Sequence, residues 1–364
     1  MISVSLGIVK NAFPLQERGK ALGIYAVAIA AGLALGPAIG GLVQGLWGWR
    51  AIFIVNVPIG ILSFISCYNF LEIGERKNVK LDFKGVILQF SGIILIVYAL
   101  NNIEIPNITF QSFFIGILGV ILIFLFILNE KSVKSPLINL KLFKNKTFIA
   151  FNISLFINYL CMYMIFFIMP FYLKMVLHLN DGIIGLILTV SPIIMMIIAP
   201  LSGYVSDKIG SRPLALTGSL ICAGAFYTMT QLNIFSSAYD VIWRLGLLGI
   251  GTAIFQSPNN RAIMNFTPKK DSGSTSSIVV TMRNLGMVFG VTTASFLLST
   301  TISLTQLNEN VLFNLAAYDF TKGMHLVMIL GTVLSLIISV LSVVGMPNRI
   351  NRTKKIVKKF KGVL

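Results

Sequence analysis

The sequence predicts an all-α protein that crosses a membrane many times. Of its 364 residues, 56% are hydrophobic and only 11% are charged, and the mean hydropathy is +0.87. Charged residues make up about a quarter of an average soluble protein, so composition alone excludes that class. A helix needs about 20 apolar residues to cross the hydrocarbon. Ten such stretches follow one another, at 21–46, 51–71, 84–101, 110–129, 147–173, 183–205, 213–232, 240–262, 276–300 and 323–345.

The basic residues predict how these stretches are oriented. Most of the 29 Lys and Arg residues fall in alternate connections and in the tail, and the opposite connections hold few. By the positive-inside rule the basic side is cytoplasmic, which predicts a multi-pass protein of the plasma (inner) membrane. The lipid bilayer then accounts for the net charge of +17, and no nucleic-acid partner is expected. The predicted cytoplasmic segments are 10–20, 72–84, 130–146, 206–213, 263–275 and the tail.

Several classes of chemistry have no support in the sequence. Cys67, Cys161 and Cys222 stand singly in apolar stretches and read as small core residues. His178 and His325 are far apart in the chain, which gives no metal site. No P-loop, nucleophile elbow or zinc-type spacing occurs. The sequence therefore predicts neither an enzyme nor a bound cofactor or metal.

A run of glycines around one proline marks the stretch 21–46. Within a bilayer, small residues at a spacing of four form a flat face on which another helix packs closely, and Gly32, Gly36 and Gly40 predict such a face. Pro37 removes a backbone donor and predicts a bend. A bent, closely packed helix suits both a moving membrane protein and a static bundle, and the spacing does not decide between them. The full run is Gly23, Gly32, Gly36, Pro37, Gly40 and Gly41.

A second motif occupies the short connection between 183–205 and 213–232. Gly203 permits a close approach of helices, and Gly210 predicts the turn. Asp207 beside Lys208 and Arg212 predicts a charge cluster that holds the two helices in one relative position and releases them in another. The alternative is a turn that sets topology, with incidental charge.

Two charges and one aromatic segment stand out inside the apolar stretches. Arg244 starts its stretch near the outer face, where snorkelling is the simplest interpretation. Arg283 is expected to pair with a carbonyl or with the Asp207 cluster, or to sense the protonation state of the missing half. No carboxylate falls at mid-membrane, and Asp181 and Asp240 are the acids expected nearest a cavity mouth. The aromatic segment predicts either an adaptable apolar cavity or a packing surface. Its candidate cavity residues are Tyr159, Tyr163, Phe166 and Met169.

Four motifs, in the order in which they follow one another along the chain, resemble those of one family. The glycine run resembles the antiporter signature of the major facilitator superfamily, and 203–212 resembles the second-half copy of its signature loop. The runs from Trp49 to Gly60 and from Phe13 to Ala21 are similar to those of its fourteen-helix drug:proton antiporter branch, the EmrB/QacA type. The resemblance implies a secondary active transporter that exports small amphipathic molecules in exchange for protons, with the proton gradient in place of a cofactor.

The resemblance also implies a division of the chain. Residues 1–71 correspond to the remnant of an N-terminal bundle (the end of helix four, then helices five and six), and 72–146 to a two-helix central insert. Residues 147–345 correspond to a complete six-helix C-terminal bundle, followed by a basic tail, 346–364. Helices one to three, with the expected proton-linked acid, would precede Met1, which predicts an N-terminal truncation. Two alternatives stay open: a transport-incompetent remnant, and an exporter of a non-drug metabolite.

Overall fold

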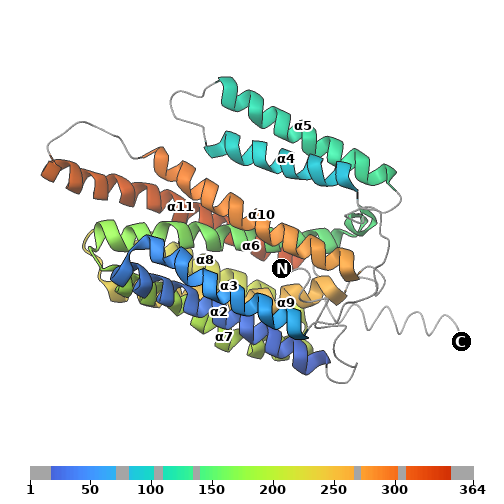
Figure 1. The fold of residues 1–364 in the computed structure, drawn as a ribbon, viewed down its shortest axis with the longest axis horizontal. Helices are drawn as coiled ribbons and strands as arrows, with labels where there is room; N and C mark the ends of the chain where they lie inside the picture. Colours follow the sequence, from blue (N-terminus) through green and yellow to red (C-terminus); the bar gives the residue numbers. More distant parts are fainter. Residues whose placement is uncertain are drawn as a thin grey trace, which may run out of the picture.

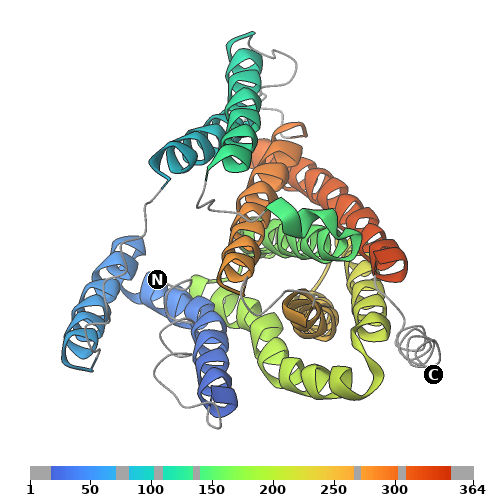
Figure 2. The same cartoon turned by 90° about the vertical axis from the view of Figure 1, so that its right-hand side faces the viewer.

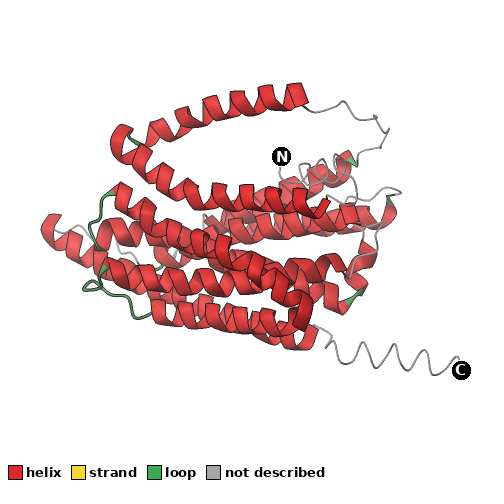
Figure 3. Ribbon diagram, turned by 90° about the horizontal axis from the view of Figure 1, so that it is seen from below, coloured by secondary structure: helices red, strands yellow, loops and turns green. Residues whose placement is uncertain are grey.

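The computed structural model describes residues 18–70, 82–101, 110–133, 140–265, 272–301 and 309–345. Within these ranges the regular secondary structure is entirely helical (Figure 3), which confirms the predicted fold class. Every predicted apolar stretch overlaps a helix. The basic tail, the run before Arg18 and parts of the predicted cytoplasmic loops lie outside the described residues. The long helices are α2 (Arg18–Trp47), α3 (Trp49–Phe70), α4 (Phe83–Asn101), α5 (Phe110–Ser132), α6 (Lys146–Phe171), α7 (Asp181–Ile209), α8 (Ser211–Met229), α9 (Ala238–Asn265), α10 (Ser272–Ser299) and α11 (Glu309–Gly345).

Length and composition make many of these helices able to cross a bilayer. Seven of them, in the part of the chain that the structure describes, are long and apolar enough, and α4 contributes a shorter apolar helix. The helices run side by side along the long axis of the molecule (Figure 1). Away from its ends and from interior prolines, a helix satisfies its backbone groups within itself, which is what a hydrocarbon environment requires.

The last six helices form a bundle with a common apolar core. In this bundle α9 packs against both α7 and α8, and α6 packs against both α10 and α11. Contacts of α6 with α9 and of α8 with α11 join these two groups. The largest fully buried side chains, Phe148, Phe151, Tyr172, Phe226 and Phe255, come from α6, α8, α9 and the π-helical turn (Tyr172–Val176) that follows α6.

Local sequence signals set the ends of several of these helices. Asn145 caps α6 by accepting a hydrogen bond from the Thr147 amide at 3.0 Å, and Asn180 caps α7 by accepting one from the Ile183 amide at 3.0 Å. Gly210 separates α7 from α8 with a φ of +94°, a backbone conformation that favours glycine. These residues fix where the chain reverses direction.

Helix α2 lies against the bundle through α7. A Cβ at Gly41 would lie 2.6 Å from the carbonyl oxygen of Asp181 and 2.9 Å from the Cα of Gly185, and a Cβ at Gly185 would overlap the Pro37 carbonyl oxygen. One turn further along, a Cβ at Gly45 would lie 3.9 Å from the Gly182 amide nitrogen. Bare backbone therefore meets bare backbone at this crossing.

This arrangement corrects the predicted packing face of α2. A Cβ at Gly32, Gly36 or Gly40 would meet no described atom within 4 Å, so the face that packs on α7 is the neighbouring one. Pro37 and Gly41 belong to that neighbouring face. The surroundings of Gly23 lie outside the described part of the chain.

Helices α4 and α5 form a separate antiparallel pair. Gly92 and Gly119 let them approach closely, since a Cβ at Gly119 would lie 2.9 Å from the Gly92 carbonyl oxygen. Asp82 accepts hydrogen bonds from the Gly85 amide at 3.0 Å and from Asn129 Nδ2 at 2.6 Å, which ties the start of α4 to the end of α5. Figure 2 shows this pair (teal) beside α10, whereas α2 (blue) lies beside α7 and α3 contacts α2.

Candidate functional site

One face of α6 carries partly exposed aromatic side chains. Phe156, Tyr159, Tyr163 and Phe166 recur at helical spacing and are each only half-buried. The Tyr163 and Phe166 rings lie edge to face, with centroids 5.9 Å apart. Met169 is different, because it is fully buried in the bundle core, so its prediction as a cavity residue is wrong.

Helix α10 lies directly against this aromatic face. A Cβ at Gly286 would lie 2.5 Å from the Phe156 carbonyl oxygen and 2.9 Å from the Tyr159 Cβ. A Cβ at Gly290 would overlap the Leu160 carbonyl oxygen and lie 3.1 Å from the Tyr163 Cβ. The two glycines thus bring the backbones of α10 and α6 into contact. Side chains on the same face of α10 as these glycines are therefore held beside the α6 aromatic residues.

Arg283 is the charged side chain that this contact positions. It lies one turn before Gly286, and its Cζ is 5.9 Å from the centroid of the Tyr159 ring. Its Nε atom is buried without a hydrogen-bond partner among the described residues. The predicted pairing of Arg283 with the Asp207 cluster stays a prediction, because the Asp207 side chain lies outside the described residues.

Three asparagine side chains add buried polar atoms to the same end of the bundle. Asn152 on α6 and Asn259 on α9 are almost wholly buried, and Asn259 Nδ2 donates to the Phe151 carbonyl at 3.3 Å. The Oδ1 atoms of Asn152, Asn259 and Asn260 have no described hydrogen-bond partner. Sequence reasoning missed all three, although asparagine inside an apolar stretch is itself a signal, because buried polar groups need partners.

The connection between α7 and α8, with the residues next to it, contacts α9. A Cβ at Gly203 would lie 3.0 Å from the Ser257 Oγ, and the Ser202 hydroxyl donates to the Ile254 carbonyl at 3.1 Å. Arg261 donates to the Ser206 hydroxyl at 3.5 Å, a contact that the sequence did not indicate. Lys208 Nζ lies 4.6 Å from the Tyr204 ring centroid. The proposed latch of Asp207 with Arg212 stays a prediction.

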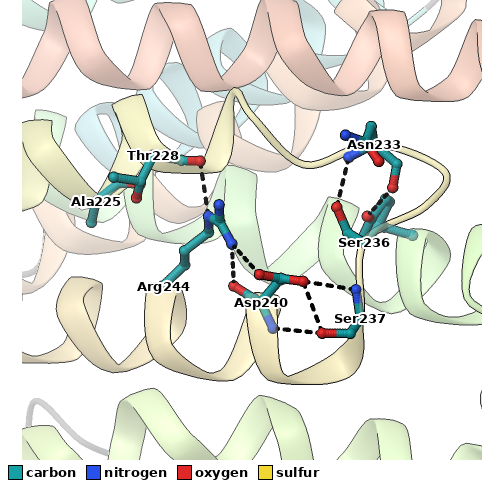
Figure 4. Close-up of polar contacts among 8 residues, drawn as sticks. Ala225, Thr228, Asn233, Ser236, Ser237, Asp240 and Arg244 are labelled. Carbon is teal, nitrogen blue, oxygen red and sulfur yellow. Dashed lines mark hydrogen bonds and ion pairs between the residues drawn. The ribbon is translucent and has the colours of Figure 1, made fainter.

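Arg244 lies in a hydrogen-bonded cluster at the opposite end of the bundle (Figure 4). Its side chain is only 8% exposed, and it donates to the Thr228 carbonyl at 2.9 Å and to the Asp240 carbonyl at 2.7 Å. It also pairs with the Asp240 carboxylate at 3.3 Å, and that carboxylate accepts from both the amide and the hydroxyl of Ser237. The prediction that Arg244 snorkels is wrong, because its guanidinium is bonded inside the bundle.

The same end of the bundle holds the α8–α9 connection in place. Tyr172 donates its hydroxyl to the Asn233 carbonyl at 2.7 Å, and His325 Nε2 lies 2.6 Å from the Leu232 carbonyl oxygen. Asp181, the other acid expected near a cavity mouth, pairs with Lys174 at 2.7 Å. Both candidate acids are therefore engaged with a cation.

Replacing Arg244 by methionine is expected to destabilise the bundle more than breaking the shorter Lys174–Asp181 pair. Loss of the guanidinium removes its buried hydrogen bonds to the Thr228 and Asp240 carbonyls, which costs about 1–3 kcal/mol. Lys174 is 56% exposed, so Lys174→Met should cost no more than about 1 kcal/mol. The measurement is thermal unfolding of the two purified variants in one detergent. A decrease in unfolding temperature for Lys174→Met as large as that for Arg244→Met would contradict a stabilising role for the buried Arg244.

Comparison with known proteins places the chain among membrane transporters. A profile of the Major Facilitator Superfamily matches residues 1–291. The riboflavin transporter RibZ of Clostridioides difficile is 35% identical over 80% of this chain and 63% of its own length. The multidrug transporter protein MdtP of Bacillus subtilis is 25% identical over 80% of this chain and 54% of its own length. The chain thus spans less than two thirds of the length of these curated relatives.

Solved structures share the fold at low sequence identity. A peptide transporter POT in complex with sulfate matches with a TM-score of 0.59 and 16% identity, covering 91% of this chain and 69% of that one. A bacterial homologue of the human lysosomal transporter Spinster, inward-facing and occupied, matches with a TM-score of 0.56 and 14% identity. It covers 94% of this chain and 72% of that one.

Proposed function

Because the chain belongs to the Major Facilitator Superfamily and is a multi-span membrane transporter, we propose that it exports small amphipathic molecules in exchange for protons. The observation that carries this proposal is the contact of α2 with α7. Backbone meets backbone there at Pro37, Gly41 and Gly185, so no side chain separates the two helices at these positions. A smooth contact of this kind suits two units that rock against each other around a central substrate.

The resemblance to multidrug exporters and the aromatic face of α6 support an amphipathic substrate. Tyr159, Tyr163 and Phe166 offer partly exposed rings beside the bare backbone of α10. Such rings bind planar apolar groups without demanding one fixed hydrogen-bond pattern. In this proposal the protein lies in the plasma membrane, with the α7–α8 connection, and its Asp207 and Arg212, on the cytoplasmic side.

A metabolite exporter is the second candidate, and one observation favours it. The riboflavin transporter RibZ is 35% identical to this chain, whereas MdtP is 25% identical over the same share of it. A heteroaromatic vitamin would use the same rings of α6. Riboflavin therefore belongs beside the drugs in any test of transport.

The test is uphill transport by the purified chain in proteoliposomes with an imposed proton gradient. Rhodamine 6G and riboflavin are the two probes, and vesicles without protein are the control. We expect one of them to accumulate only while the gradient lasts and to leak out when an uncoupler is added. If neither accumulates under either direction of the gradient, the chain inserts without transporting, as the remnant alternative states.

A further inference from the structure

Arg283 carries a charge that no described neighbour neutralises. It lies in the candidate membrane span Thr275–Ser299, where a charged side chain is costly and is retained for a function. A guanidinium does not lose its proton in proteins, so the charge persists. Among the described residues the ion pairs are Lys174–Asp181 and Arg244–Asp240, and neither involves Arg283. Its buried Nε also lacks a hydrogen-bond acceptor.

The surroundings of Arg283 are aromatic and closely fixed. Tyr159 lies under the guanidinium, with 5.9 Å between Cζ and the ring centroid. At the same crossing of the two helices, Phe156 of α6 and Phe289 of α10 lie edge to face with centroids 6.0 Å apart. The backbone contact at Gly286 holds the two helices in this register. An aromatic ring bound here would lie beside a fixed positive charge.

A second unpartnered polar group lies on the same face of α6. Asn152 is two turns before Tyr159, and its Oδ1 atom is buried without a described partner while its Nδ2 donates to the Phe148 carbonyl at 2.9 Å. Asn152 is 1% exposed. The open atom is an acceptor, so a water molecule or a donor group of a ligand satisfies it, and not an anionic group.

We propose that Arg283 and the aromatic face of α6 form a subsite for the acidic group of an aromatic substrate, so that aromatic anions bind in preference to aromatic cations of similar size. The inference rests on the proposed transport function and names its substrate class. The guanidinium donates to the anionic group, and the Tyr159 and Phe156 rings contact the aromatic part. The substrate supplies the negative charge that Arg283 lacks in the described structure.

A simpler explanation is that Arg283 is held only by its stacking and hydrogen-bond contacts with Tyr159. The chain offers a matched control for that explanation. Lys322 of α11 lies 4.4 Å from the Tyr318 ring centroid, closer than Arg283 to Tyr159, but its side chain is exposed. If stacking of a cation on tyrosine is all that matters, the two positions should respond alike to loss of the cation.

The test compares binding of two xanthene dyes to the purified chain in detergent. Fluorescein is an anion and rhodamine 6G a cation, and fluorescence anisotropy gives the Kd of each without requiring transport. We expect the wild type to bind fluorescein more tightly. Arg283→Gln should weaken fluorescein binding by about tenfold or more, the loss expected for a buried charge-assisted hydrogen bond. Lys322→Gln should leave both Kd values unchanged, and Arg283→Lys should keep part of the preference.

The possible outcomes separate this subsite from the transport function. Equal binding of the two dyes, tighter binding of rhodamine 6G, no dye binding at all, or an unchanged dye ratio in Arg283→Gln would each overturn the subsite. A thermal unfolding curve of Arg283→Gln that matches wild type ensures that a lost preference is not lost folding. Preference for fluorescein without transport in proteoliposomes would leave the subsite standing and reject the proposed function. Transport of rhodamine 6G without a preference for fluorescein would support the proposed function and reject the subsite.

Discussion

Replacing Gly290 with leucine is expected to separate α10 from α6 and to lower the unfolding temperature of the bundle strongly. A Cβ at this position would overlap the Leu160 carbonyl oxygen, and that backbone atom cannot rotate away as a flexible side chain would. Overpacking in a core costs about 1–3 kcal/mol and more where backbone must move. The displaced α10 would also carry Arg283 away from Tyr159. We expect a lower unfolding temperature in detergent and weaker fluorescein binding.

The matched control is Gly224 on α8. It is also in mid-helix, but a Cβ there would meet no described atom within 4 Å. Gly224→Leu adds the same apolar volume without a clash, so we expect unfolding at or above the wild-type temperature. If the two leucine variants unfold at the same temperature, close packing of α10 on α6 is not what stabilises this bundle.

Replacing Gly41 with leucine is expected to separate α2 from α7 and to stop transport, whereas the same change at Gly40 is not. The two glycines are neighbours in the sequence and in the same motif. A Cβ at Gly41 would lie 2.6 Å from the Asp181 carbonyl oxygen, whereas one at Gly40 would meet no described atom within 4 Å. Size, helix propensity and distance along the chain are thus equal between the variants, and only the packing differs.

Disulfide formation measures this contact directly. A Gly45→Cys and Gly182→Cys pair lies at the same crossing, one turn from Gly41, and exposed Cys67 is replaced by serine in all chains compared. We expect the pair to cross-link in the otherwise unchanged chain and with Gly40→Leu, but to lose most cross-linking with Gly41→Leu. Cross-linking of equal extent in both leucine variants would show that α2 does not rest on α7 through Gly41.

The sequence predicted the helices well because composition constrains them strongly. In hydrocarbon the backbone must bond to itself, so each long apolar stretch has helix as its simplest solution. The sequence did not predict which face of α2 packs against α7. Gly32, Gly36 and Gly40 repeat at a spacing of four, and so do Pro37, Gly41 and Gly45. Both series look alike in one sequence, and the position of Gly182 and Gly185 on α7 decides which one packs.

The errors at the candidate site have similar physical origins. Arg244 is bonded to the Thr228 carbonyl on another helix, which no local pattern reveals. Its pair with Asp240, four residues earlier, was readable as an i,i+4 ion pair and was missed. Met169 follows Phe166 by three residues and so continues the helical spacing of the aromatic face, and only the structure shows that the other helices of the bundle bury it. The contact of Arg283 with Tyr159 depends on the α6–α10 crossing and needed the structure.

The most direct measurement of the central claim is proton movement driven by substrate alone. Proteoliposomes containing the purified chain start with equal pH inside and outside, and fluorescein or riboflavin is then supplied on one side only. An exchanger must move protons against the direction of the substrate, so the account predicts a pH change inside the vesicles that an uncoupler abolishes and that Gly41→Leu lacks. Substrate flux without any change in internal pH, or the same pH change in vesicles without protein, would contradict it.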